Sequence, residues 1–221
     1  MILEDGKNIG NDGKNDGKVY VIKTTQTSFD NGATSAGISK SEAKETEKFI
    51  KANSGNTAAF ESNNIAYENS SEIEGSQETR QSMVDIVSKD TGNGGTSDAN
   101  NREYGGIIRD GKVTESPAGP VGNPQTDSEA SIIHPDVRNS DKTFHSHPSG
   151  QIVQGSGASG GTQLGGTSTI DSWGKAPSAY DISNAKGTNY VFSRSDGTVY
   201  IFNKSGVTAT IPQKRFVEFK K

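Results

Sequence analysis

The spacing of apolar positions predicts a small number of amphipathic helices in this chain. Within Glu78–Lys89, Met83, Ile86 and Val87 recur at helical spacing, so their side chains fall on one face of a helix. Gly92 to Gly95 then ends this helix, and its apolar face is expected to pack on a core. The other expected helices are Ser39 or Ser41 to Lys51, with Ser39 and Glu42 as a capping box, a weaker one at Thr57–Tyr67, and Ser178–Lys186.

Shorter apolar runs between turn residues predict strands. Glu103–Glu115 is expected to form a hairpin that turns at Asp110-Gly111, and a second hairpin is expected to turn at Asp196-Gly197. The expected strands outside the first hairpin are Val19–Lys23, Ala130–Ile133, Lys142–His147, Tyr190–Ser193, Thr198–Asn203 and Val207–Ile211. Strands and helices in this order indicate an α/β fold.

Composition limits the classes of protein to which this chain can belong. Its 221 residues include 29% hydrophobic residues and 27 glycines, so we expect only part of the chain to pack tightly. The net charge of −4 argues against general nucleic-acid binding. The chain has no apolar run long enough to span a membrane, and its first residues do not resemble a signal peptide. Because cysteine is absent, a metal site must use histidine and carboxylate ligands.

The segment 143–150, with the sequence TFHSHPSG, carries the strongest indication of chemistry. It contains two of the three histidines of the chain. Side chains two positions apart on a strand point to the same face, so His145 and His147 can aim at one metal ion. Pro148 lacks an N–H group, so we expect the strand to end there. The pair alone also fits two partly exposed histidines at a strand end, because a catalytic zinc needs a third protein ligand.

Residues that can complete such a site lie on both sides of the histidine pair. Glu103 precedes a strand-like run, and Asp181 follows in the sequence Pro-Ser-Ala-Tyr-Asp. With Ser178, they form the pattern E…HSHP…SxxD, which resembles the JAMM metalloprotease family, also called MPN+ or JAB. The HSHP core is the most specific part of this likeness. The resemblance implies a mixed β-sheet flanked by helices over residues 76–221.

The resemblance also implies a role for each matched residue. Zn²⁺ is then held by His145, His147 and Asp181, Glu103 activates a water molecule, and Ser178 donates a hydrogen bond near the reacting carbonyl oxygen. Simpler interpretations stay open for three of these residues. Ser178 fits the N-cap of a helix with Asp181 near the positive end of its dipole, and Glu103 fits an ordinary exposed carboxylate.

The chain departs from the family pattern between His147 and Asp181, which lie much farther apart than in that family. The excess, about residues 150–175, is rich in glycine, serine and threonine and is expected to be a flexible loop or a lid. Asp171 in this insertion is a rival third ligand. Trp173 is expected to anchor the loop, with a substrate contact as the alternative, and His134 is expected to be a loop or strand-end histidine rather than a ligand.

Residues 1–75 are not explained by this resemblance and are expected to form a loop-rich extension. Their glycine-rich segment DGKNDGKVYVIKT is similar to the junction that precedes the toxin domain of bacterial polymorphic toxins, such as those with Rhs repeats. The likeness implies a payload of a larger secreted protein, delivered into a target cell, with a cognate immunity protein as partner.

Three functions follow from these observations. The leading hypothesis is a zinc-dependent peptidase or isopeptidase that acts as a toxin or effector module on a protein or peptide substrate. The second is a catalytically inactive JAMM-like module that binds a peptide or partner protein. The third is a relative of the RadC type, which shares HSHPSG, although the acidic balance of the chain counts against a nucleic-acid role.

Overall fold

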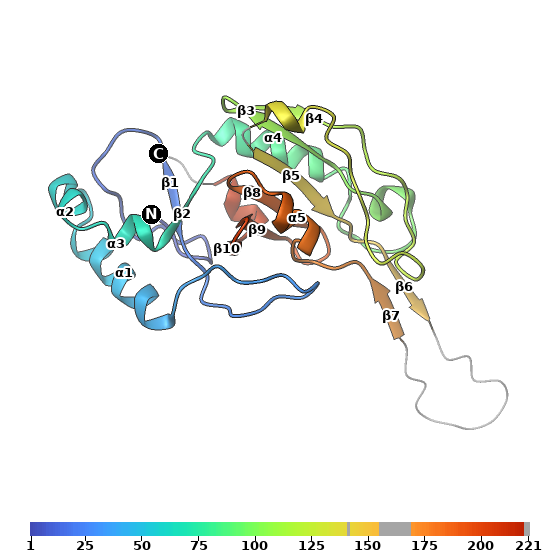
Figure 1. The fold of residues 1–221 in the computed structure, drawn as a ribbon, viewed down its shortest axis with the longest axis horizontal. Helices are drawn as coiled ribbons and strands as arrows, with labels where there is room; N and C mark the ends of the chain where they lie inside the picture. Colours follow the sequence, from blue (N-terminus) through green and yellow to red (C-terminus); the bar gives the residue numbers. More distant parts are fainter. Residues whose placement is uncertain (141, 155–168, 219–221) are drawn as a thin grey trace, which may run out of the picture.

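The computed structural model describes residues 1–140, 142–154 and 169–218, and a six-stranded mixed sheet lies at its centre (Figure 1). The strand order is β10-β9-β8-β5-β3-β4, and neighbours are antiparallel except for the parallel pair β5 and β8. The strands are β3 (Gly105–Arg109), β4 (Lys112–Glu115), β5 (Lys142–His147), β8 (Asn189–Ser193), β9 (Thr198–Asn203) and β10 (Gly206–Pro212). The predicted α/β class is confirmed, whereas the likeness to the JAMM fold stays a prediction.

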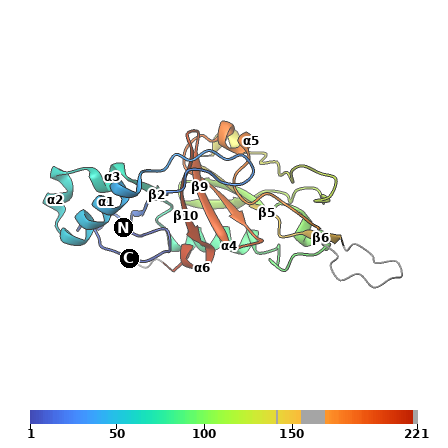
Figure 2. The same ribbon diagram turned by 90° about the horizontal axis from the view of Figure 1, so that it is seen from below.

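Two helices cover opposite faces of this sheet (Figure 2). Helix α4 (Gln77–Val87) buries Met83 and Val87 against one face, where alternate sheet residues such as Phe144 and Phe192 join them. Helix α5 (Ala179–Asn184) packs on the other face, beside the alternate strand residues that point away from α4. Because Phe144 points toward α4, the strand alternation directs His145 and His147 to the face that carries α5.

The helix α1 (Lys40–Ala52) begins as its sequence predicts. The hydroxyl of Ser39 accepts a hydrogen bond from the backbone N–H of Glu42, and the Glu42 carboxylate accepts one from the backbone N–H of Ser39. These two contacts form the capping box, which satisfies two N–H groups that the helix cannot pair internally. Thr46 and Ile50 form its buried side.

The weaker helix expected at Thr57–Tyr67 is two short helices, α2 (Thr57–Ser62) and α3 (Ile65–Glu68). Asn63 separates them in an extended conformation, with φ of −142° and ψ of 111°. Its side-chain oxygen accepts a hydrogen bond from the Ile65 N–H at 3.0 Å. Asparagine thus offers the backbone a local partner that competes with a continuous helix.

Two other expectations need correction. Ala130–Ile133 is not one of the strands in the described residues, although its two isoleucines are typical of a strand. The insertion is not a loop throughout, because β6 (Gln151–Gln154) and β7 (Thr169–Ser172) pair as an antiparallel ladder. Residues 155–168, which the flexible-loop prediction also covers, lie outside the described residues.

The region 1–75 packs against the sheet as well as on itself. Strand β1 (Val19–Ile22) pairs with β2 (Ser70–Ile73), and apolar side chains of both strands join the cluster between α4 and the sheet. Farther along the chain, the Ala36 N–H donates to Val207 in β10. Two 3-10 turns (Asp98–Asn101 and Val137–Asn139) and the short C-terminal α6 (Gln213–Phe216) complete the described elements. Among these helices, none has the length and apolar character that crossing a membrane requires.

Candidate metal site

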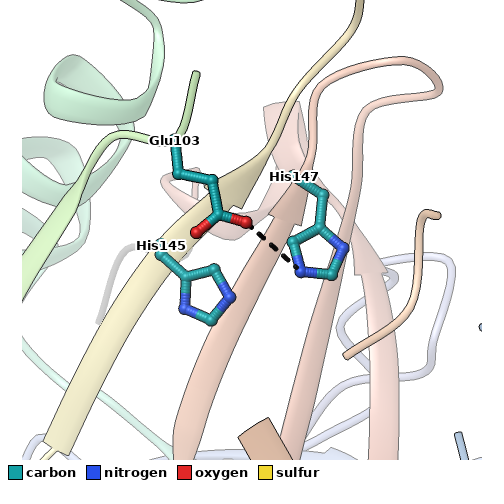
Figure 3. Close-up of side chains that lie close together, drawn as sticks. All are labelled: Glu103, His145 and His147. Atoms are coloured by element: carbon teal, nitrogen blue, oxygen red, sulfur yellow. Dashed lines mark ion pairs between the residues drawn. The ribbon is translucent and has the colours of Figure 1, made fainter. Parts of the chain in front are cut away.

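The candidate site lies at the end of β5, on the face of the sheet that carries α5. His145 pairs with Gly105 of β3 on one side and with Val191 of β8 on the other, so it is fixed within the sheet. His147 is the last residue of the strand. Glu103 comes from the segment just before β3, and Figure 3 shows its carboxylate beside the two imidazole rings. All three side chains are buried.

These three side chains form a group that can hold a metal ion. One ligand atom from each of Glu103, His145 and His147 lies within 4.8 Å of the others. The Glu103 Oε1 atom is 3.8 Å from His147 Nε2. A buried carboxylate facing two imidazoles is costly unless the charges are paired or bind a metal. The geometry therefore agrees with the metal chemistry that the histidine spacing predicts.

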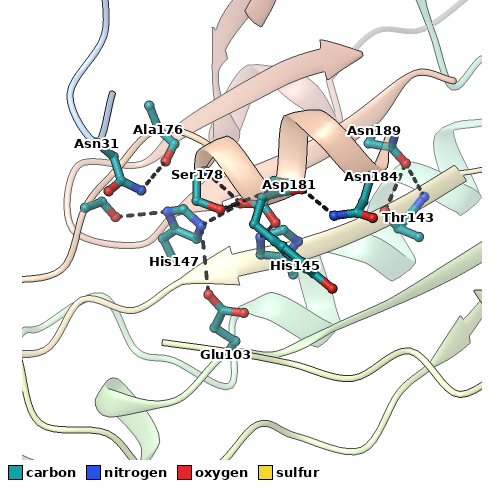
Figure 4. Close-up of polar contacts among 12 residues, drawn as sticks. Asn31, Glu103, Thr143, His145, His147, Ala176, Ser178, Asp181, Asn184 and Asn189 are labelled. Atoms are coloured by element: carbon teal, nitrogen blue, oxygen red, sulfur yellow. Dashed lines mark hydrogen bonds and ion pairs between the residues drawn. The ribbon is translucent and has the colours of Figure 1, made fainter. Parts of the chain in front are cut away.

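Asp181 faces the same two histidines from α5 (Figure 4). Its Oδ1 atom is 3.5 Å from His145 Nε2, and its Oδ2 atom is 3.7 Å from His147 Nε2. Asp181 and His147 are thus far apart in the sequence but close together in the structure. Asp171, the rival third ligand, lies on β7 and accepts a hydrogen bond from Gln154 instead.

The start of α5 holds the Asp181 carboxylate in place. Its Oδ2 atom accepts hydrogen bonds from the backbone N–H of Ser178 at 2.8 Å and from the Ser178 hydroxyl at 2.9 Å. The Ser178 oxygen in turn accepts the N–H of Asp181, which completes a capping box. The cap interpretation and the site interpretation of Ser178-x-x-Asp181 therefore describe the same local structure. Asp181 Oδ1 has no contact with this cap and faces His145.

A backbone carbonyl orients the ring of His147. Its Nδ1 atom lies 2.9 Å from the oxygen of Gly174, so Nδ1 carries the proton and donates it there. The other ring nitrogen, Nε2, is then free of its proton and available as a ligand in the neutral ring.

Burial and neighbouring charges shift the pKa of three of these groups. Burial raises the pKa of the Glu103 carboxyl, although both imidazoles oppose the shift. Burial also acts to raise the pKa of Asp181, but the attraction to His145 and His147 outweighs it and lowers this pKa. Burial acts to lower the pKa of His145, and the charges of Asp181 and Glu103 outweigh it and raise this pKa to about 9. In the absence of metal, the site thus favours an ionised Asp181 beside a protonated His145.

The site opens into a cavity of about 440 Å³. Tyr180 and Asn184 of α5 line the cavity, and so does the segment 128–134. His134 belongs to this wall: its Nδ1 lies 2.8 Å from the Ser116 hydroxyl, and burial and the nearby His145 lower its pKa to about 4. It is not part of the group of possible metal ligands found among the described residues.

Several residues that support the site were not identified from the sequence. Trp173 anchors the segment after β7, as expected, but through an unforeseen partner: its Nε1 donates to Asn101 Oδ1 at 3.1 Å. The fully buried Asp90 holds the exit of β5, because its carboxylate accepts both the N–H and the hydroxyl of Ser149. Asp30 contacts the backbone after Gly174. Contacts so distant in the sequence leave no local pattern by which they could be recognised.

No protein-family model matches this chain, and neither a curated protein nor a solved structure matches it. The chemistry of the site itself is therefore what supports a function for this chain.

Proposed function

We propose that this protein is a zinc-dependent peptidase or isopeptidase of the JAMM type. The observation that carries the proposal is the Asp181 carboxylate, whose two oxygens face His145 Nε2 and His147 Nε2 at 3.5 and 3.7 Å. Two ligands bonded to one tetrahedral zinc ion lie about 3.3 Å apart, given zinc bonds of about 2.0–2.1 Å. Both distances from Asp181 to the histidines are within about 0.5 Å of that spacing.

Each residue of the site then has a defined task. His145, His147 and Asp181 would hold the metal, and a bound zinc ion would lower the pKa of a water molecule to about 7 and polarise a substrate carbonyl. Glu103 takes the proton of the attacking water and delivers it to the departing amine. Its burial, which raises its pKa, suits a carboxylate that must both accept and release a proton.

Ser178 contributes first by fixing the ligand. In this structure its hydroxyl donates to Asp181 at 2.9 Å, which keeps the carboxylate directed at the histidines. Ser178 also lines the cavity. The role expected from the resemblance, donation to the substrate carbonyl oxygen, requires the hydroxyl to turn from Asp181 into that cavity. The backbone N–H of Ser178 still holds Asp181 after such a rotation.

The cavity wall formed by residues 128–133 supports a peptide as the substrate. This stretch belongs to neither a helix nor a strand, and none of its backbone N–H and C=O groups pairs with another described residue. Unpaired backbone groups along a cleft can bind an extended peptide as an added strand. The exposed side chains of Ile133 and Tyr180 flank the same cavity and offer apolar contacts to such a peptide.

Zinc content and one substitution test the proposal together. We expect protein purified without added metal to contain about one zinc per chain, and His145→Ala and Asp181→Ala to lose it. Glu103→Gln is expected to keep the zinc and to hydrolyse a peptide library and isopeptide-linked lysine conjugates at least about 100-fold more slowly. Glu61→Gln is the matched control, because Glu61 is exposed and, among the described residues, pairs with Lys14 at 3.7 Å.

Two outcomes contradict this function. Full hydrolytic activity in zinc-loaded Glu103→Gln removes Glu103 as the base. Absence of zinc after reconstitution removes the metal and favours the module that binds a peptide or partner protein. A delivered toxin with an immunity protein rests on the sequence likeness of the N-terminal region and stays a prediction.

A further inference from the structure

We infer that Asp30, in the N-terminal region, is a positioning residue for His147 and acts through a single peptide group. This inference deepens the proposed metal function and rests on it in one respect, the effect on metal affinity. It assigns a task to a part of the chain that the resemblance leaves unexplained.

The link runs through the peptide between Gly174 and Lys175. The carbonyl oxygen of Gly174 accepts the hydrogen bond from His147 Nδ1 at 2.9 Å. The N–H of the same peptide, which belongs to Lys175, donates to Asp30 Oδ2 at 3.0 Å. The peptide is trans, so its C=O and N–H point in opposite directions. Asp30 and His147 thus hold the two ends of one rigid planar group.

Asp30 binds this segment with both oxygens. Its Oδ1 atom accepts the next backbone N–H, that of Ala176, at 2.9 Å. The neighbouring Asn31 donates from its side chain to the Ala176 oxygen at 3.3 Å. Three hydrogen bonds from two adjacent residues therefore fix the chain just before the N-cap of α5.

The loop that carries Asp30 is itself anchored to the sheet. The ring of Phe29 packs edge-on against Tyr200, with centroids 5.8 Å apart. Ala33 is buried in the same apolar cluster as Ala176 and Ile182. The loop therefore has a fixed position from which Asp30 can act, although its carboxylate is exposed to solvent.

The arrangement has two physical consequences for His147. A carboxylate on the N–H side polarises the peptide, so the Gly174 oxygen becomes a stronger acceptor for the imidazole proton. The stronger hydrogen bond fixes the tautomer and the ring orientation that leave Nε2 as the ligand. A direct carboxylate partner of a histidine ligand typically changes metal affinity about 10- to 100-fold. We expect roughly three- to tenfold for Asp30, because it acts through an intervening peptide and is exposed.

The experiment compares Asp30→Ala and Asp30→Asn with the unmodified chain. Zn²⁺ affinity is measured by competition with a chelator, and the Nδ1–H resonance of His147 is measured by nuclear magnetic resonance in the metal-free protein. We expect both variants to bind Zn²⁺ more weakly and the His147 resonance to move upfield. Asp16→Asn is the control, because Asp16 is an exposed turn residue whose oxygen accepts the N–H of Lys18, a contact that asparagine can also make.

The outcomes separate this inference from the metal function. Unchanged affinity and an unmoved resonance in both Asp30 variants overturn the inference, even where the melting temperature falls. If Asp30→Ala fails to fold, the isosteric Asp30→Asn decides. If the unmodified chain binds no Zn²⁺, the proposed function fails, and the resonance of the metal-free protein alone decides whether Asp30 positions His147.

Discussion

The proton on His145 provides a quantitative test of the site, because it competes directly with a metal ion. In the metal-free protein, burial disfavours the charged ring, but the charges of Asp181 and Glu103 more than compensate. The Oδ1 atom of Asp181 is the nearest partner, at 3.5 Å from His145 Nε2. We therefore expect His145 to be protonated at neutral pH and Asp181→Asn to lower its pKa.

The expected magnitude follows from the shift of the His145 pKa from 6.5 to about 9. At about 1.4 kcal/mol for each pKa unit, the charged form is favoured by about 3 kcal/mol. Because the folded pKa exceeds the unfolded one, this stabilisation of the metal-free protein is fully present below pH 6.5. It is lost as the pH rises through about 9. A metal ion must displace the proton on His145. Protonation of His145 therefore weakens metal binding about 300-fold at pH 6.5, relative to the metal affinity reached above pH 9.

Titration of the imidazole resonances of the metal-free protein measures this pKa directly. Asp171→Asn serves as the matched control, because Asp171 lies on β7 and pairs with Gln154. The reasoning is refuted by a His145 pKa at or below 6.5, or by one that does not fall in Asp181→Asn. Either result means that the carboxylate does not lie beside His145 in solution.

Two further substitutions test the structure behind the metal strand. Asp90→Asn is expected to destabilise the protein by about 2 kcal/mol in urea unfolding, because a fully buried amide cannot accept every hydrogen bond that the carboxylate receives from Ser149; an unchanged midpoint contradicts the contact. Gly150→Ala is expected to cost about 1–3 kcal/mol and to change the fluorescence of the sole tryptophan, Trp173, because the added methyl overlaps the Asn101 oxygen that accepts the indole N–H; unaltered emission and stability show that the packing is looser than described.

The parts of the fold that the sequence predicts are those with short-range causes. The Asp110-Gly111 turn, with both residues at positive φ, joins β3 to β4 at the expected place. The cap of α1 at Ser39 is also local, since all its atoms lie within one helical turn. Such signals need no knowledge of the rest of the chain.

The parts that were wrong depend on partners elsewhere in the chain. Ala130–Ile133 has the composition of a strand, but a strand exists only when another backbone pairs with it, and none does among the described residues. The reverse holds for β6 and β7, where glycine- and serine-rich surroundings suggested a loop while the flanking Ile152 and Val153 pair with Asp171 and Ile170. The composition of a segment indicates its preference for the strand conformation, but pairing with another backbone decides whether a strand forms.

The same distinction explains how much of the candidate site could be predicted. A metal ligand or a base must have a particular side chain, so Glu103, His145, His147 and Asp181 could be singled out as candidates from residue type and order, and the structure brings them together. The groups that orient them are under no such restriction. A backbone oxygen, that of Gly174, holds His147, and because every residue carries such an oxygen, this role leaves no mark on the residue type. The sequence can therefore name the residues that would carry out the reaction but not the atoms that hold them in position. Only substitutions of the residues that provide these atoms, such as those at Asp30, can show how much the site depends on them.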